Sequence, residues 1–175
     1  MRPSETHRPG QLGVVTIWRD GEPVQLELPW GLRPFEAGGK PVSLLRWDGR
    51  EITRPGLLVV DGFGLRIDGK DKYRVRMPAH AQFCVACVWQ PASGDWPAAY
   101  AALTTEAYPD IAPYKDRHMA VVREDDWFAW LRLERPAEQL LRPFPAGSFV
   151  VAGPKPALVR QPAHERVSED LFGHR

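Results

Sequence analysis

The frequency of proline and glycine is the feature that most limits what this chain can fold into. Of its 175 residues, 18 are proline and 15 are glycine. Proline fixes φ and removes a backbone N–H donor, and glycine favours turns, so both interrupt regular structure. At this density the chain turns often and its regular elements are short. A bundle of long helices is therefore excluded.

Short apolar or alternating runs between these turns predict a β-rich domain. Gly13 to Trp18 and Val24 to Leu28 flank a turn at residues 19–22, a pattern typical of a hairpin. Leu57 to Val60 is an apolar run typical of a buried strand. Further strands are expected over residues 73–77, 83–89, 101–105, 119–122 and 149–151, the last of which would close the sheet.

Two helices are expected near the end of the domain. Glu124 to Leu133 begins with three acidic residues, which suit the positive end of a helix dipole, and Trp127, Trp130 and Leu131 share one face. A shorter helix is expected from Ala137 to Leu141. The predicted fold class is therefore α+β, with a mostly antiparallel, strongly curved, barrel-like sheet and a few short helices.

Composition and charge describe an ordinary globular protein. Hydrophobic residues make up 43% and charged residues 26% of the chain, and the net charge is +1, so any surface for nucleic acid must be local.

Residues 1–10 are expected to form a loose segment, residues 11–153 one domain and residues 154–175 a polar tail. No run approaches the roughly 20 apolar residues of a membrane helix, and the start lacks an apolar signal stretch. We expect a cytoplasmic monomer without cofactor or membrane partner.

Cys84 and Cys87 form a C-x-x-C motif inside an apolar run. Zinc needs four ligands and no second pair exists, and side chains three residues apart on a strand point to opposite faces. Burial in the core is the favoured interpretation, and redox or metal chemistry is the alternative. His118 is expected at the surface, and the absence of a G-x-S-x-G motif leaves a serine hydrolase unsupported.

Six short segments, in order, resemble one protein family. They are Trp30-Gly31-Leu32-Arg33-Pro34, Leu58-Val59-Val60-Asp61-Gly62-Phe63, Ala86-Cys87-Val88-Trp89, Leu103-Thr104-Thr105-Glu106-Ala107, Asp116-Arg117 and Leu140-Leu141-Arg142-Pro143-Phe144-Pro145. Together they resemble the SOS response-associated peptidase (SRAP) family, whose members bond covalently to abasic sites in single-stranded DNA. The likeness covers roughly residues 9 to 152.

The positions at which that family carries its chemistry differ here. The family's nucleophile is a cysteine directly after the initiator Met, where this chain has Arg2, and its Asn, Glu and His positions correspond to Leu44, Leu65 and Lys115. Leucine can neither donate nor accept a proton, so the family's acid–base steps lack their groups. The resemblance therefore implies a pseudoenzyme in DNA-damage (SOS) processing.

The resemblance also implies a retained DNA surface. Arg46 and Arg117 match positions that contact backbone phosphates, and Thr104 and Thr105 match positions near the same path. Trp30 and Trp47 offer flat faces for base stacking, and Lys115 adds a positive charge. The predicted DNA-binding residues are thus Trp30, Arg46, Trp47, Thr104, Thr105, Lys115 and Arg117.

Other interpretations of the same residues stay open. Trp30 and the arginines have structural roles as alternatives, in packing or in ordinary ion pairs. A protein-interaction or regulatory module that kept the scaffold without DNA is the runner-up function. A third possibility is an enzyme in which the Lys115 amine, or that of Met1, forms a Schiff base with the sugar aldehyde.

Overall fold

The fold was analysed in a computed structural model that describes residues 8–153. The expected segments at residues 1–7 and 154–175 lie outside the described residues. The strands are β1 (Leu12–Arg19), β2 (Glu22–Pro29), β3 (Leu44–Arg46), β4 (Pro55–Val60), β5 (Phe63–Ile67), β6 (Lys70–Arg76), β7 (Phe83–Gln90), β8 (Ala99–Glu106), β9 (Arg117–Met119), β10 (Val121–Val122) and β11 (Val150–Ala152). The helices are the 3₁₀ turn η1 (Glu124–Asp126), α1 (Trp127–Arg132) and α2 (Ala137–Leu140).

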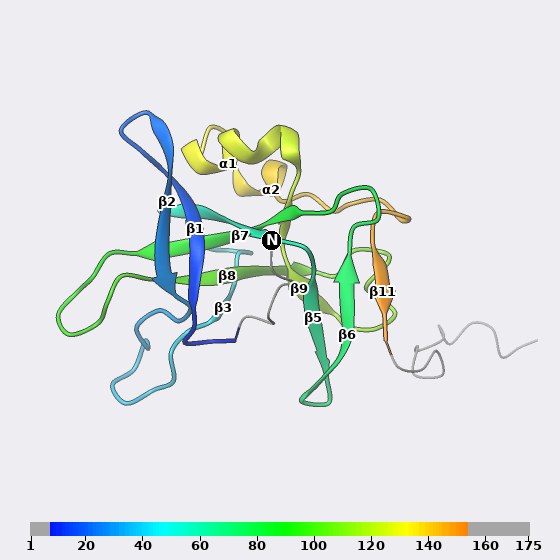
Figure 1. The fold of residues 1–175 in the computed structure, drawn as a ribbon, viewed down its shortest axis with the longest axis horizontal. Helices are drawn as coiled ribbons and strands as arrows, with labels where there is room; N and C mark the ends of the chain where they lie inside the picture. The colour runs from blue at the N-terminus through cyan, green and yellow to red at the C-terminus, as the bar shows by residue number, and fades with distance from the viewer. Residues whose placement is uncertain (1–7, 154–175) are drawn as a thin grey trace, which may run out of the picture.

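The strands form two sheets (Figure 1). The larger has eight strands in the order β2-β1-β4-β7-β8-β3, with β10 added to β7 and β9 added to β8. The smaller has the order β11-β6-β5. All pairings are antiparallel except that of β3 with β8, which is parallel. The predicted α+β class with a mostly antiparallel sheet is confirmed.

The prediction of a barrel-like, strongly curved sheet was wrong in that detail. The large sheet stays open, with β2 and β3 at its two ends, and β11 pairs with β6 instead of closing it. The physical reason lies at Gly62, between β4 and β5. A Cβ there would lie 2.6 Å from the Val75 carbonyl oxygen, so only glycine allows this close approach. The chain leaves the large sheet at this point and starts a second one.

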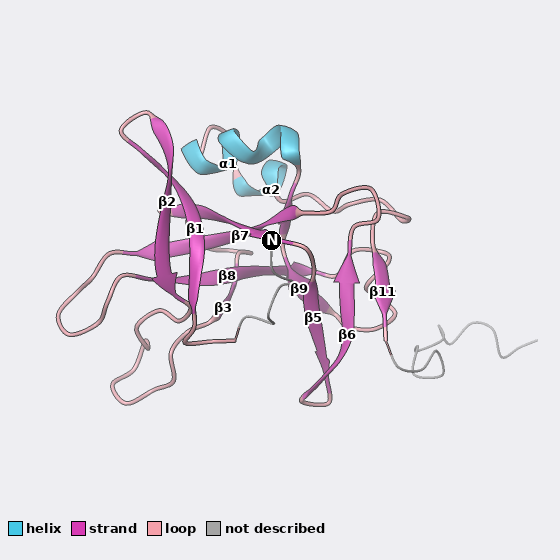
Figure 2. Cartoon of the chain, viewed as in Figure 1, coloured by secondary structure: helices cyan, strands magenta, loops and turns pink. Residues whose placement is uncertain are grey.

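The two faces of β7 show how the layers pack. Val85 belongs to a core cluster with Phe63 and Val75 of the small sheet, whereas Cys84 and Ala86 belong to a cluster with Trp130 and other residues of the helices. Successive strand residues point to opposite faces, so the small sheet covers one face of β7 and the helices cover the other (Figure 2). This double burial explains the continuous apolar run in the sequence.

The helical segment is shorter than the sequence pattern predicted. Residues 124–126 form a 3₁₀ turn, and α1 ends at Arg132, followed by the C-cap residue Leu133, whose φ of 51° is left-handed. The predicted apolar face is present: Trp130 and Leu131 are buried, and Trp127 packs against the same cluster. Asp126 is buried at the start of α1 and is paired with Arg135 and Arg142.

The cysteines are buried in different clusters, as expected. Cys84 lies with the helices and Cys87 with residues of β1 and β2. Burial raises the pKa of Cys84 to about 12 and also raises that of Cys87, so both thiols are protonated at neutral pH.

Among the described residues no three His, Cys, Asp or Glu side chains are grouped as metal ligands. No described helix is long and apolar enough to cross a membrane.

Candidate nucleic-acid interface

Thr104 is the centre of the site because β8 lies between β3 and β9. On one side, Thr104 is in register with Arg46 of β3, and on the other it is in register with Met119 of β9. Neither β3 nor its parallel pairing was predicted from the sequence. Residues in register project from the same face of a sheet, so Arg46 and Thr104 are side by side.

Arg117 reaches the same place from β9. Its Nη2 donates to the Thr104 carbonyl oxygen at 2.8 Å, and its Nε and Nη2 both lie 3.4 Å from Thr104 Oγ1. Nη2 also donates to Asp48 Oδ2 at 2.5 Å, in an ion pair whose arginine side chain is only 18% exposed. The arginine is therefore held in a fixed position by a neighbouring strand and by a carboxylate.

Arg46 differs from Arg117 in its exposure and in its lack of an ion pair among the described residues. It is exposed, and among residues 8–153 it forms no ion pair. Guanidinium groups recognise the oxygens of a phosphate through several N–H donors at once. Arg46 and Arg117 lie on either side of Thr104. Arg117 is held in place by its contacts, whereas Arg46 is exposed and forms no ion pair among the described residues. Together they form a surface that suits successive phosphates of a nucleic-acid strand.

The two candidate tryptophans are held in structural contacts. Trp30 donates from Nε1 to the Ser43 carbonyl oxygen at 2.7 Å and packs parallel to Tyr100, with ring centroids 6.2 Å apart. Trp47 is half-buried against the helix cluster, and its buried Nε1 has no hydrogen-bond partner among the described residues. Trp30 thus attaches the segment before β3 to the sheet, and most of the Trp47 indole is covered.

Thr105 and Lys115 occupy different environments. Thr105 is buried and in register with His118, so its side chain points away from the surface that carries Thr104. Lys115 is half-buried at the end of the connection between β8 and β9, where its backbone N–H donates to the Ile111 carbonyl oxygen at 3.1 Å. It lies two residues before Arg117.

His118 is buried, contrary to the expectation of a surface residue. Its Nε2 accepts a hydrogen bond from the Tyr108 backbone N–H at 3.0 Å, and its Nδ1 lies 2.7 Å from the Met119 carbonyl oxygen. The imidazole is therefore neutral, with the proton on Nδ1. Burial and the nearby Arg117 lower its pKa to about 4, although the bond to Met119 acts in the opposite direction. His118 fixes the loop between β8 and β9, which carries Lys115.

The positions that resemble the family's acid–base residues lie on different elements. Leu65 is 2% exposed inside the core beneath the small sheet, and Leu44 is 49% exposed on β3. Lys115 lies in the β8–β9 connection, and Arg2 is outside the described residues. Neither leucine has a group that could transfer a proton.

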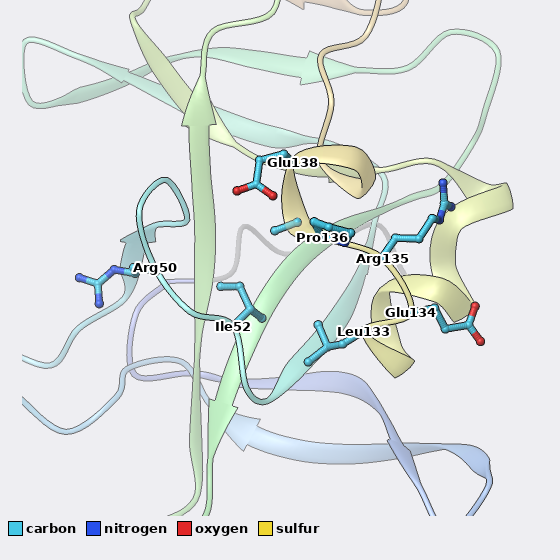
Figure 3. Close-up of a pocket in the computed structure, with 8 residues that line it drawn as sticks. Arg50, Ile52, Leu133, Glu134, Arg135, Pro136 and Glu138 are labelled. Atoms are coloured by element: carbon cyan, nitrogen blue, oxygen red, sulfur yellow. The ribbon is translucent and has the colours of Figure 1, made fainter.

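Two pockets lie away from this interface. One, of about 350 Å³, is lined by Arg50 and Ile52 after β3 and by residues 133–138, which run from the end of α1 into α2 (Figure 3). The other, of about 330 Å³, lies near Met77 and Phe144. The interface at Thr104 is thus a surface of projecting side chains and not one of these pockets.

Three features of the structure were missed in the sequence. Asp48 is the ion partner of Arg117, and Phe35 is 72% exposed with the Arg50 guanidinium 5.8 Å from its ring centroid. His118 is the third. Asp48 follows Arg46 by two residues, but no local pattern indicates a partner that is 69 residues away.

The family model for SOS response associated peptidase (SRAP) matches residues 54–156, more than half of the chain, so Arg46 and Asp48 lie before the matched segment. No curated protein sequence matches.

Solved structures resemble the chain in fold. A protein from Bordetella bronchiseptica is 21% identical with a TM-score of 0.66, covering 87% of this chain and 90% of its own. A phage-related protein from the same organism is 20% identical with a TM-score of 0.62, covering 87% and 80%. A protein from Bacteroides thetaiotaomicron is 14% identical with a TM-score of 0.62, covering 87% and 82%. With the family match and the ordered motifs, these findings show that the chain belongs to the SRAP family.

Proposed function

We propose that this protein binds single-stranded DNA, including strands with abasic sites, through phosphate contacts at the β3–β8–β9 surface, and that it does not trap the sugar covalently. Membership of the SRAP family supports a function associated with the SOS response and DNA damage. The observation that carries the proposal is the convergence of Arg46 and Arg117 on Thr104 from two different strands. The surface comprises Arg46, Thr104 and Arg117, with Lys115 nearby.

Loss of the covalent reaction is supported by the side chains at the matching positions. Proton transfer at the sugar needs groups that gain and lose a proton near the working pH. Leu44 and Leu65 have none, and the nearby imidazole of His118 is buried, with both nitrogens in hydrogen bonds. The surface is therefore proposed to recognise the strand without changing it.

The phosphate contacts can be tested by fluorescence anisotropy with a labelled oligothymidylate of about 16 nucleotides. In Arg46→Ala and Arg117→Ala, each loss of one phosphate contact is expected to weaken binding about three- to tenfold. It should also reduce the slope of log K against log salt concentration by about 0.7.

Arg74→Ala is the matched control for these variants. Arg74 lies on β6 and is paired with Asp61, so its removal changes net charge equally but in the small sheet. It should leave affinity within about twofold at 0.15 M salt, where charges beyond about 8 Å are screened. Equal weakening in all three variants, or no wild-type binding at low salt, contradicts the proposal.

Borohydride trapping tests the absence of a covalent step. With an oligonucleotide that contains one abasic site, a Schiff base between an amine and the sugar aldehyde would be reduced to a stable adduct. We expect no adduct on denaturing gels. An adduct that disappears in Lys115→Ala would instead assign lyase chemistry to Lys115, and one that persists in that variant would indicate another amine.

The second candidate function is a protein-interaction or regulatory module that kept the scaffold without DNA. One observation favours it: Arg117 is already neutralised by Asp48. Under this alternative, wild-type protein shows no binding to single strands at low salt, and neither arginine variant has an effect.

A further inference from the structure

We propose that the Asp48 carboxylate occupies the place of a strand phosphate on Arg117 and is displaced when single-stranded DNA binds. This inference rests on the proposed function and adds to it a built-in competitor that sets affinity. Asp48 would then be an autoinhibitory contact of the interface.

The partners of Arg117 fall into two kinds. The Thr104 carbonyl oxygen and hydroxyl belong to the sheet itself, where β8 is paired on both sides, so they stay in place. Asp48 lies on the turn after β3, closed by the Arg50 backbone N–H donating to the Trp47 carbonyl oxygen, and its side chain is 42% exposed. The exchangeable partner is therefore the carboxylate.

The chemistry of the two anions supports exchange. A carboxylate and a phosphodiester each carry one negative charge and offer two oxygens to a guanidinium. The Arg117 side chain is 18% exposed, and a partly covered charge is stabilised by a nearby counter-charge. Asp48 supplies it in the free protein, and a phosphate supplies it in the complex. Binding must first break the ion pair, which lowers the observed affinity.

Asp48→Asn tests this directly. The asparagine keeps an acceptor oxygen for Arg117 Nη2 but removes the competing charge. Affinity for the labelled oligothymidylate at 0.15 M salt is expected to rise about two- to fivefold, and fivefold corresponds to an ion pair worth about 1 kcal/mol.

Asp61→Asn is the matched control, since Asp61 forms the equivalent 2.5 Å pair with Arg74 of the small sheet. It makes the same change in net charge and should alter affinity by less than about twofold because of screening. In an Arg117→Ala background, Asp48→Asn should not increase affinity, because there is then no Arg117 guanidinium for which Asp48 and a phosphate compete.

The outcomes separate this inference from the function on which it rests. If wild type binds and Arg117→Ala weakens binding, but Asp48→Asn gains no more than Asp61→Asn, the exchange is refuted and the DNA surface stands. A gain from Asp48→Asn that persists without Arg117 also refutes it, since general repulsion would then be the cause. If neither wild type nor Asp48→Asn binds single strands, both the function and the inference are wrong.

Discussion

Acidification from pH 7 to pH 4 is expected to lower the free energy of unfolding by about 3 kcal/mol through His118 alone. The imidazole is 4% exposed, and burial, its largest influence, lowers its pKa to about 4 from an ordinary value near 6.5. Protonation would place a second donor against the Tyr108 N–H that now donates to Nε2. Because the folded-state pKa lies below the unfolded one, the unfolded chain binds more protons between these values. Stability is thus complete above about pH 6.5 and is lost as pH falls toward 4.

Urea unfolding at several pH values measures this effect. Carboxylates also titrate below pH 5, so the informative quantity is the difference between wild type and His118→Gln, which cannot be protonated. That difference should change by up to about 1.4 kcal/mol per pH unit, with the steepest change midway between pH 6.5 and 4. His80→Gln is the control for replacing a histidine by glutamine, because His80 is exposed. Parallel profiles for wild type and His118→Gln would show that His118 is protonated at little cost.

Trp130→Ala is expected to destabilise the protein by about 3–5 kcal/mol, the range for removing a fully buried tryptophan. Trp130 is 0% exposed and belongs to the cluster that joins α1 and α2 to the large sheet. Its Nε1 also donates to the Gly56 carbonyl oxygen on β4 at 2.9 Å, and truncation leaves that acceptor without this partner. The variant removes both the largest apolar side chain of this layer and its bond to the sheet.

Chemical denaturation measures the loss, and Phe128→Ala is the matched control on the same helix. Phe128 is 53% exposed and contacts Trp18 edge-on, so its truncation should cost less than about 1 kcal/mol. Similar losses in the two variants would mean that α1 contributes little to the core and that the helical layer is not needed for the sheet.

Much of the candidate site could be predicted, but its arrangement could not. Arg46, Thr104 and Arg117 were identified from short motifs, and the structure brings all three together. Trp30, Trp47 and Thr105 were assigned to the same surface, yet their side chains are covered by packing. A motif gives the type of a residue but not its exposure, because exposure depends on neighbours that are distant in sequence.

The sequence by itself determined the short elements and the antiparallel class, because turns, alternation and apolar runs act within a few residues. It also determined the family, because the six motifs are short and occur in a fixed order. The burial of β7 was also predicted from its apolar run, although not which layers cover its two faces. Only the tertiary structure decided that the sheet stays open, that β3 joins β8 in parallel and that Asp48 meets Arg117. Such pairings join segments far apart in the chain, and their geometry follows from how all the layers pack and not from any local pattern.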